Sequence, residues 1–138
     1  MGVFLDTNIL LYSVSVRSDE VEKRSISNEL LERLDCILSV QVFQEFYAQA
    51  TRPSRSDALK HPDAISLMEG WRRFQVVENT LALFDAAMEI RQSTGYSIWD
   101  CSILAAAQAS GCGTLYSEDM AHGRNVGGVT IVNPFMPE

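Results

Sequence analysis

Short apolar runs alternate along the chain with longer segments in which apolar residues recur at helical spacing. The runs that suit buried strands lie at residues 3–5, 36–38, 114–116 and 129–132, with 75–77 as a possible fifth. Strands that alternate with helices are the order expected of a parallel sheet covered by helices. The pattern therefore predicts an α/β fold with a mostly parallel central sheet.

The segments between these runs carry residues that start and stop helices. Ser18, Ser39, Thr80 and Ser97 suit helix N-caps, and Pro62 suits a first turn. Pro53, Gly95 and Gly111 mark helix ends. Helical spacing places these residues inward: Val21, Ile26, Leu30 and Leu34; Ile65, Leu67, Met68 and Trp71; Leu81, Phe84, Ala87 and Met88.

The length and composition suit one soluble domain. The chain has 138 residues, of which 46% are hydrophobic and 21% charged, so it can form a core and is not disordered. It has no internal repeat, low-complexity tract or linker. We expect a single domain over residues 1–138.

The net charge limits the possible partners. The chain has 18 acidic and 11 basic residues, for a net charge of −7. This balance argues against a protein that coats nucleic acid by bulk electrostatics. It does not exclude a nuclease, because a bound metal ion can invert the local field.

The cysteines and the hydropathy favour a cytoplasmic location. Cys36, Cys101 and Cys112 form no CxxC pair, and their odd number does not suit a disulfide framework. No apolar run approaches the ~18 residues of a membrane span, and the N-terminus lacks the basic stretch expected of a signal peptide, since the first basic residue is Arg17. We expect no membrane partner.

Four acids are expected at one edge of the predicted sheet. Asp6 follows the first strand, and Asp119 follows the strand that ends at Tyr116. Glu45 and Asp100 lie in the early turns of the helices that Ser39 and Ser97 open. Strand C-termini and the following helix N-termini gather along one edge of a parallel sheet. All four carboxylates should therefore reach the same place.

Each acid also has an ordinary structural role. Asp6 suits an N-cap, Asp100 a capping box with Ser97, Asp119 a turn and Glu45 a solvated helix face. Four converging carboxylates would repel one another, however, and a fold tolerates this mainly where a cation is bound. The joint placement therefore favours a metal site.

The residues around these acids resemble those of PIN-domain ribonucleases. The similar stretches are VFLDTN at 3–8, QEFY at 44–47, SIWD at 97–100 with ILAAA at 103–107, and LYSEDM at 115–120. Within that family the chain resembles the small VapC-type toxins of bacterial toxin-antitoxin pairs. The resemblance implies a PIN-like three-layer α/β/α sandwich.

The resemblance also implies an activity, a cofactor and partners. The acids match a quartet that holds Mg2+ or Mn2+ and cleaves RNA, and two polar residues match positions that support it: Asp6, Glu45, Asp100 and Asp119; Asn8 and Ser117. A cognate antitoxin that packs on the mid-chain helices is implied, as is a homodimer.

Carboxylates suit this chemistry because a phosphodiester and hydroxide are both negative. A nuclease therefore needs a cation to screen the phosphate and to lower the pKa of water. We expect Asp6 and Asp100 to be direct ligands. Glu45 and Asp119 would complete a second metal site or orient metal-bound waters.

Other functions stay open on the sequence alone. They are an RNA-processing PIN nuclease that is not a toxin, a phosphotransfer or phosphatase module, and a non-catalytic interaction module. The segment after Asp6 lacks the second Asp of the phosphatase motif, and an intact quartet speaks against a purely interacting module. Trp99 could stack a nucleobase, but we expect it to close the core.

Overall fold

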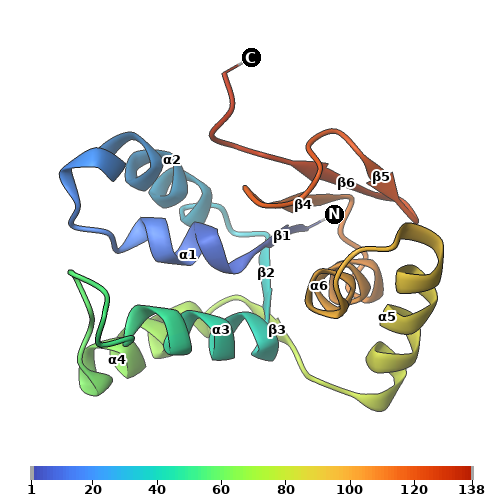
Figure 1. The fold of residues 1–138 in the computed structure, drawn as a ribbon, viewed down its shortest axis with the longest axis horizontal. Helices are drawn as coiled ribbons and strands as arrows, with labels where there is room; N and C mark the ends of the chain where they lie inside the picture. Colours follow the sequence, from blue (N-terminus) through green and yellow to red (C-terminus); the bar gives the residue numbers. More distant parts are fainter. Residues whose placement is uncertain (1, 138) are drawn as a thin grey trace.

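A single mixed sheet organises the protein. The computed structural model describes residues 2–137, which form six strands, six α-helices and one short 3₁₀ helix (Figure 1). The strands are β1 (Val3–Leu5), β2 (Cys36–Ser39), β3 (Gln75–Val77), β4 (Thr114–Tyr116), β5 (Asn125–Val126) and β6 (Val129–Val132). Their order is β3-β2-β1-β4-β6-β5, and only β5 runs antiparallel to its neighbour. All five predicted strands are confirmed.

Helices cover both faces of this sheet. They are α1 (Thr7–Ser13), α2 (Val21–Leu31) after the 3₁₀ turn Ser18–Glu20, α3 (Val40–Ala50), α4 (His61–Trp71), α5 (Leu81–Thr94) and α6 (Ile98–Ala109). Figure 1 shows α1 to α4 on one side and α5 with α6 on the other. The predicted three-layer α/β/α architecture is therefore confirmed.

The strand order reverses at β1, which lies between β2 and β4. Ligands of open α/β sheets bind outside the carboxyl ends of the strands at such a reversal, because the following helices diverge there and leave a crevice. The residues that follow β1 and β4 lie at this point. They include Asp6 and Asp119.

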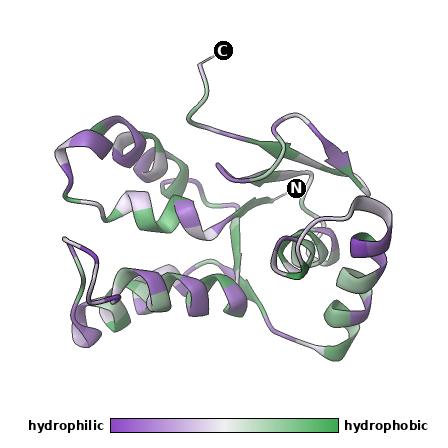
Figure 2. Ribbon diagram, in the orientation of Figure 1, coloured by the Kyte–Doolittle hydropathy of each residue, from purple (hydrophilic) through white to green (hydrophobic). Residues whose placement is uncertain are grey.

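The core explains why the inner strands form. All residues of β1 and β2 are buried, and both strands are apolar along most of their length (Figure 2). On the α1–α4 side Phe46 packs edge-on against Trp71, with ring centroids 4.8 Å apart. Burial of an apolar side chain of this size stabilises the fold by about 1.5–3 kcal/mol. Such contacts hold the helices against the sheet.

The expected helix ends are largely confirmed. Ser39, Thr80 and Ser97 accept hydrogen bonds from the amides of the third residues after them. Gly95 ends α5 in the left-handed conformation at φ 73°, which side chains disfavour. The segment after Asp6, whose first residue was expected to follow an N-cap, forms the seven-residue helix α1.

The predicted inward faces of three helices were partly wrong. The exposed residues are Val21 at 62%, Leu34 at 99%, Ile65 at 36%, Leu81 at 76% and Phe84 at 52%. α2 ends at Leu31, so Leu34 lies beyond it. α5 buries Ala87, as predicted, and also Ile90, because its small residues allow close packing on α6.

Two further features add to the fold. No strand was predicted at β5, which pairs with β6 through a turn that contains Gly127 and Gly128, both at positive φ.

Among the helices in residues 2–137, none combines the length and apolar character needed to cross a bilayer.

Candidate active site

Asp6 stands at the carboxyl end of β1 and caps α1. Its carboxylate accepts hydrogen bonds from the Thr7 amide (2.7 Å) and from the Ser117 hydroxyl (2.7 Å). The side chain is buried, with 7% of the residue exposed. The N-cap role expected of Asp6 is therefore real, and the Ser117 contact joins β1 to the end of β4.

The surroundings of Asp6 disfavour its charge. The pKa of Asp6 is raised to about 6, chiefly by burial; the hydrogen bonds from Ser117 and Thr7 oppose this rise, and the nearby carboxylates of Glu45 and Asp100 add to it. Two neutral donors do not offset the loss of water around a buried carboxylate. A cation at this position would favour the ionised form.

Glu45 reaches the same place from α3. Because Ser39 fixes the start of α3, Glu45 lies in its second turn. Its Oε1 accepts a hydrogen bond of 2.9 Å from the Thr7 hydroxyl. Thr7 therefore bridges the residue after β1 to α3, a role that the sequence interpretation did not assign to it. Its position between Asp6 and Asn8 was the available signal.

Asp100 lies in the first turn of α6, on the other side of the sheet. Its amide donates to the Ser97 hydroxyl (3.1 Å), which is the expected cap. Burial raises the pKa of Asp100 above its ordinary value, and Asp119 adds to the rise, whereas the Ser97 hydroxyl opposes it.

Asp119 lies in the irregular segment after β4 and is exposed. Its Oδ2 accepts a hydrogen bond of 3.2 Å from the Asn8 side-chain amide. Its own amide donates to the Ser117 hydroxyl over 3.3 Å. Asn8 and Ser117 thus contact the acids that they were predicted to support.

The structure brings all four acids to one cavity of about 100 Å³. The described residues that line it are Asp6, Thr7, Asn8, Leu11, Glu45, Gln49, Asp100, Ile103 and Asp119. None of these is a lysine or an arginine, so the negative charge has no cationic partner in the lining. The catalytic roles of these residues stay a prediction.

The carboxylate oxygens in this cavity suit a hard divalent cation, but they do not surround one completely. Within residues 2–137, no three His, Cys, Asp or Glu side chains stand close enough together to hold one ion. Mg2+ commonly keeps several waters and uses one or two carboxylates, so a closed cage is not required. The carboxylates of Asp6 and Glu45 each already accept a hydrogen bond from a neighbouring residue. A metal ion would have to share their oxygens with those hydrogen-bond donors.

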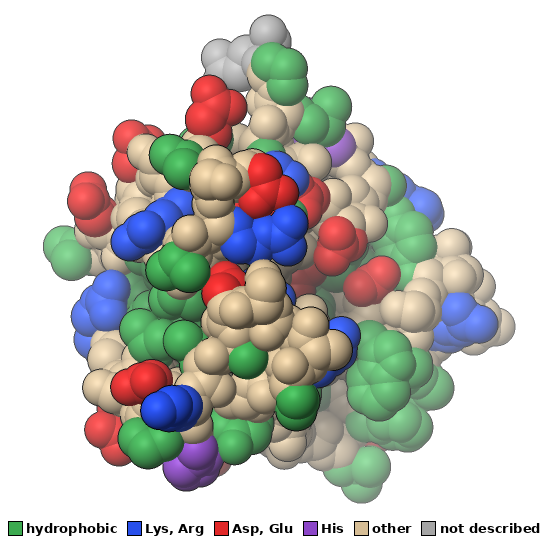
Figure 3. Space-filling view, turned by 60° about the vertical axis from the view of Figure 1, so that its left-hand side comes forward, with side chains coloured by type: hydrophobic (Ala, Val, Ile, Leu, Met, Phe, Trp, Pro, Cys, Tyr) green, Lys and Arg blue, Asp and Glu red, His purple; other side chains and the backbone are tan. Residues whose placement is uncertain are grey.

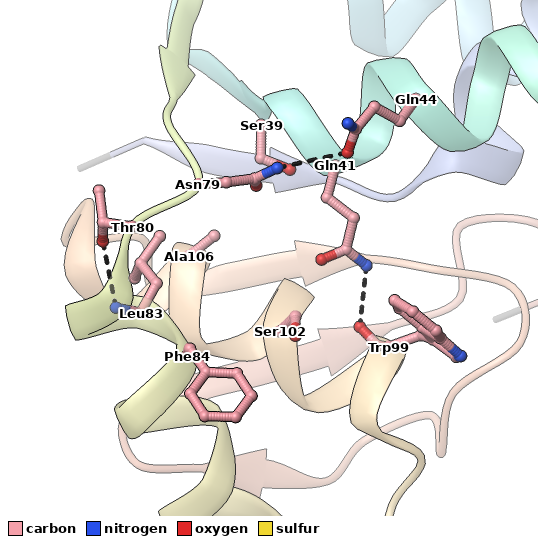
Figure 4. A pocket seen from close by; sticks show the side chains of 10 residues that line it. All are labelled: Ser39, Gln41, Gln44, Asn79, Thr80, Leu83, Phe84, Trp99, Ser102 and Ala106. Atoms are coloured by element: carbon pink, nitrogen blue, oxygen red, sulfur yellow. Dashed lines mark hydrogen bonds between the residues drawn. The ribbon is translucent and has the colours of Figure 1, made fainter.

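A second cavity contains none of the four acids in its lining. It measures about 200 Å³ and lies between α3, α5 and α6; its lining includes Gln44 and Asn79, whose side chains are hydrogen-bonded to each other, together with Phe84 and Trp99 (Figure 4). The Gln41 side chain donates to the Trp99 carbonyl over 3.1 Å. The expectation that Trp99 closes the core was wrong, since it is 64% exposed. The first turn of α6 turns its indole outward.

The face of the protein drawn in Figure 3 offers no broad basic surface. On the face drawn in Figure 3, acidic and basic side chains are interspersed and form no continuous basic area. Attraction for a polyanion therefore depends on local sites on this face.

Comparison with known proteins agrees with this architecture. The model of the PIN domain family matches residues 3–125. No curated protein sequence matches the chain significantly.

Several solved structures share the fold. VapC20 of Mycobacterium tuberculosis, a toxin that cleaves the sarcin-ricin loop, is 17% identical over 86% of this chain and 90% of its own, with a TM-score of 0.68. A toxin-antitoxin complex from Klebsiella pneumoniae is 20% identical over 98% of both chains, with a TM-score of 0.69. DNA-bound VapBC from Salmonella typhimurium is 16% identical over 95% of this chain and 96% of its own, with a TM-score of 0.64. With the family model matching most of its length, this chain belongs to the PIN domain family.

Proposed function

We propose that this protein is a metal-dependent ribonuclease and the toxin of a toxin-antitoxin pair. The observation that carries the proposal is the convergence of four carboxylates on one cavity with no cation in its lining. Membership of the PIN domain family and the fold shared with VapC toxins support a nuclease.

The four acids take different parts in this proposal. Asp6 and Asp100 are the direct ligands of Mg2+ or Mn2+, because both are partly withdrawn from water and have raised pKa values that a cation would lower. Glu45 and Asp119 complete a second site or orient water. Asn8, Ser117 and Thr7 fix the directions of the carboxylates.

When bound, the ion screens the phosphate charge and lowers the pKa of the attacking water. The chain supplies the surrounding geometry. Leu11 and Ile103 form apolar walls beside the acids, which limits the water that competes for the site. The crevice at the reversal of strand order leaves an open side for an RNA strand.

The test is incubation of RNA with the protein and Mg2+ or Mn2+, with and without a chelator. We expect cleavage that needs the metal and stops with the chelator. No cleavage with either metal, or cleavage that survives chelation, would contradict the proposal. Acetyl phosphate in a parallel reaction should not phosphorylate the protein, since the cavity lacks the lysine that a phosphoacceptor site would use.

Growth distinguishes a toxin from an RNA-processing enzyme. Expression of the wild type should arrest growth, and expression of Asp100→Asn should not. RNA cleavage in vitro without growth arrest would favour the RNA-processing alternative.

A cognate antitoxin is the proposed protein partner. The solved complexes of similar fold include toxin-antitoxin pairs. A segment of such a partner that packs on the mid-chain helices could place an arginine among the acids, where this chain provides no cation of its own in the cavity lining.

We also propose that the protein forms a homodimer through an apolar patch made of Leu81, Phe84 and Trp99. These side chains lie on α5 and the first turn of α6 and are more than half exposed. Large apolar side chains grouped at a surface indicate an interaction site.

Light scattering tests the dimer. Wild type should have twice the 15.4 kDa mass of the chain. Phe84→Glu should be monomeric, because a charge buried in an apolar interface costs several kcal/mol, on the order of 3. The control Leu34→Glu, at another exposed leucine, should stay dimeric. A monomeric wild type would contradict the proposal.

A further inference from the structure

Asp119 differs from the other three acids in how its backbone is held. Asp6 caps α1, Glu45 lies within α3 and Asp100 lies in the first turn of α6. Asp119 instead lies between β4 and β5, where residues 117–124 form neither helix nor strand. Side chains on helices are placed more accurately than those on loops. The direction of Asp119 must therefore depend on side-chain contacts.

Part of this support comes from the cavity itself. The Ser117 hydroxyl donates a hydrogen bond to Asp6 and accepts one from the Asp119 amide. The Asn8 amide group contacts both residues that follow Ser117, because its Oδ1 accepts the Glu118 amide over 3.3 Å and its Nδ2 donates to Asp119. These contacts hold the cavity side of the loop.

The other side of the loop is held through Glu118. Its carboxylate accepts hydrogen bonds from the Tyr12 hydroxyl and from the Lys23 ammonium, the latter over 2.5 Å. The Lys23 ammonium also donates to the Tyr12 hydroxyl over 3.3 Å. A charged pair with a third, neutral donor fixes both carboxylate oxygens. We call Tyr12, Lys23 and Glu118 the Glu118 clamp.

Aromatic packing surrounds the Glu118 clamp. The Lys23 ammonium lies 4.9 Å from the centroid of the Tyr12 ring and 5.7 Å from that of Phe135. The two rings meet edge to face, with centroids 5.1 Å apart. Because Tyr12 lies on α1 and Lys23 on α2, the clamp ties the loop to two helices.

We propose that Tyr12 and Lys23 are positioning residues, which hold Glu118 so that the next residue, Asp119, keeps its direction into the cavity. The proposal rests on the proposed function. Lys23 has a second effect, since it neutralises a fifth carboxylate beside the four acids. The Glu118 clamp therefore fixes the loop without adding the charge of Glu118 to the repulsion among the four acids.

A structural ion pair would look similar, so a matched pair is needed as a control. Arg33 and Asp35 are 2.9 Å apart, and the Arg33 side chain is 42% exposed against 39% for Lys23. Exposed pairs of this kind contribute little to stability. Arg33→Met therefore removes the cation of a comparable ion pair, as Lys23→Met does, but at a position away from the four acids.

The experiment compares Lys23→Met, Tyr12→Phe and Arg33→Met with wild type. In the metal-free proteins, hydrogen exchange at the Glu118 and Asp119 amides should be about 10-fold faster in the two clamp variants and unchanged in Arg33→Met. The midpoint of Mn2+ binding to the folded protein, measured by titration at constant temperature, should increase about 10-fold, as is typical when a residue that orients a ligand is lost. Tyr12→Phe removes one hydroxyl and keeps the ring contact with Phe135.

Two results would overturn the clamp. One is unchanged exchange and an unchanged Mn2+ midpoint in both clamp variants. The other is a lower melting temperature without any change in the Mn2+ midpoint, which is the behaviour of an ordinary structural pair. In the Asp119→Asn background, Lys23→Met should no longer shift the midpoint. A wild type that neither responds to Mn2+ nor cleaves RNA would overturn the proposed function instead, while amide exchange would still test the clamp.

Discussion

Asp100→Asn should lower the rate of RNA cleavage by about three orders of magnitude, which corresponds to about 4 kcal/mol in the activation barrier. The amide has nearly the volume of the carboxylate, but it carries no charge for a metal. The Ser97 cap uses the backbone amide of residue 100, so α6 should still start correctly. Single-turnover cleavage at saturating Mn2+ measures the effect.

Asp63→Asn is the matched control for this substitution. Asp63 also lies in the first turn of a helix, α4, and is exposed. It does not line the acidic cavity. Its replacement should leave cleavage unchanged. Equal activity of Asp100→Asn and wild type would show that the site has been misplaced.

Asp6→Asn should make the metal-free protein at least as stable as wild type at pH 7.5. Burial raises the folded-state pKa of Asp6 from 3.8 to about 6, so the protonated carboxyl favours the folded state. This contribution is full below pH ~4 and is lost as the pH rises through about 6, a change of about 3 kcal/mol at most. Asparagine has no such titration. The difference in melting temperature between variant and wild type should therefore grow from pH 4 to pH 7.5.

The same substitution should reduce the response to metal. Mn2+ that binds only the folded state stabilises it by RT ln(1 + [L]/Kd), about 2.7 kcal/mol at 100 times Kd. Loss of a ligand charge at Asp6 raises Kd, so the metal-induced rise in melting temperature should shrink. Melting with and without Mn2+ at constant ionic strength measures this. Asp35→Asn, whose acid is exposed and paired with Arg33, should respond like wild type. Equal rises in Asp6→Asn and wild type would remove Asp6 from the site.

The arrangement of the acids could be predicted because the backbone determines it. Asp6 directly follows a strand, and Asp100 lies three residues after a recognisable cap. In a parallel sheet these positions share one edge whatever the side chains pack against. The sequence therefore indicated the cavity before any contact was known.

Other features depend on packing that local patterns do not contain. α5 is apolar on more than one side, so the helical period alone could not show that Ile90 is buried while Leu81 and Phe84 are exposed. The Glu118 clamp joins Lys23 to a residue 95 positions away. No signal of spacing marks such a pair, which becomes visible only when α2 and the loop after β4 are placed together.

The ends of the RNA products test the central claim most directly. If water attacks the phosphate at the acidic cavity, each cut should leave a 5′ phosphate and a 3′ hydroxyl. Mass spectrometry of a short RNA cleaved by the wild type with Mn2+ identifies these ends. Products with 5′ phosphate and 3′ hydroxyl ends are the predicted result. Products with 2′,3′-cyclic phosphate and 5′ hydroxyl ends would show attack by the ribose hydroxyl and would contradict the account.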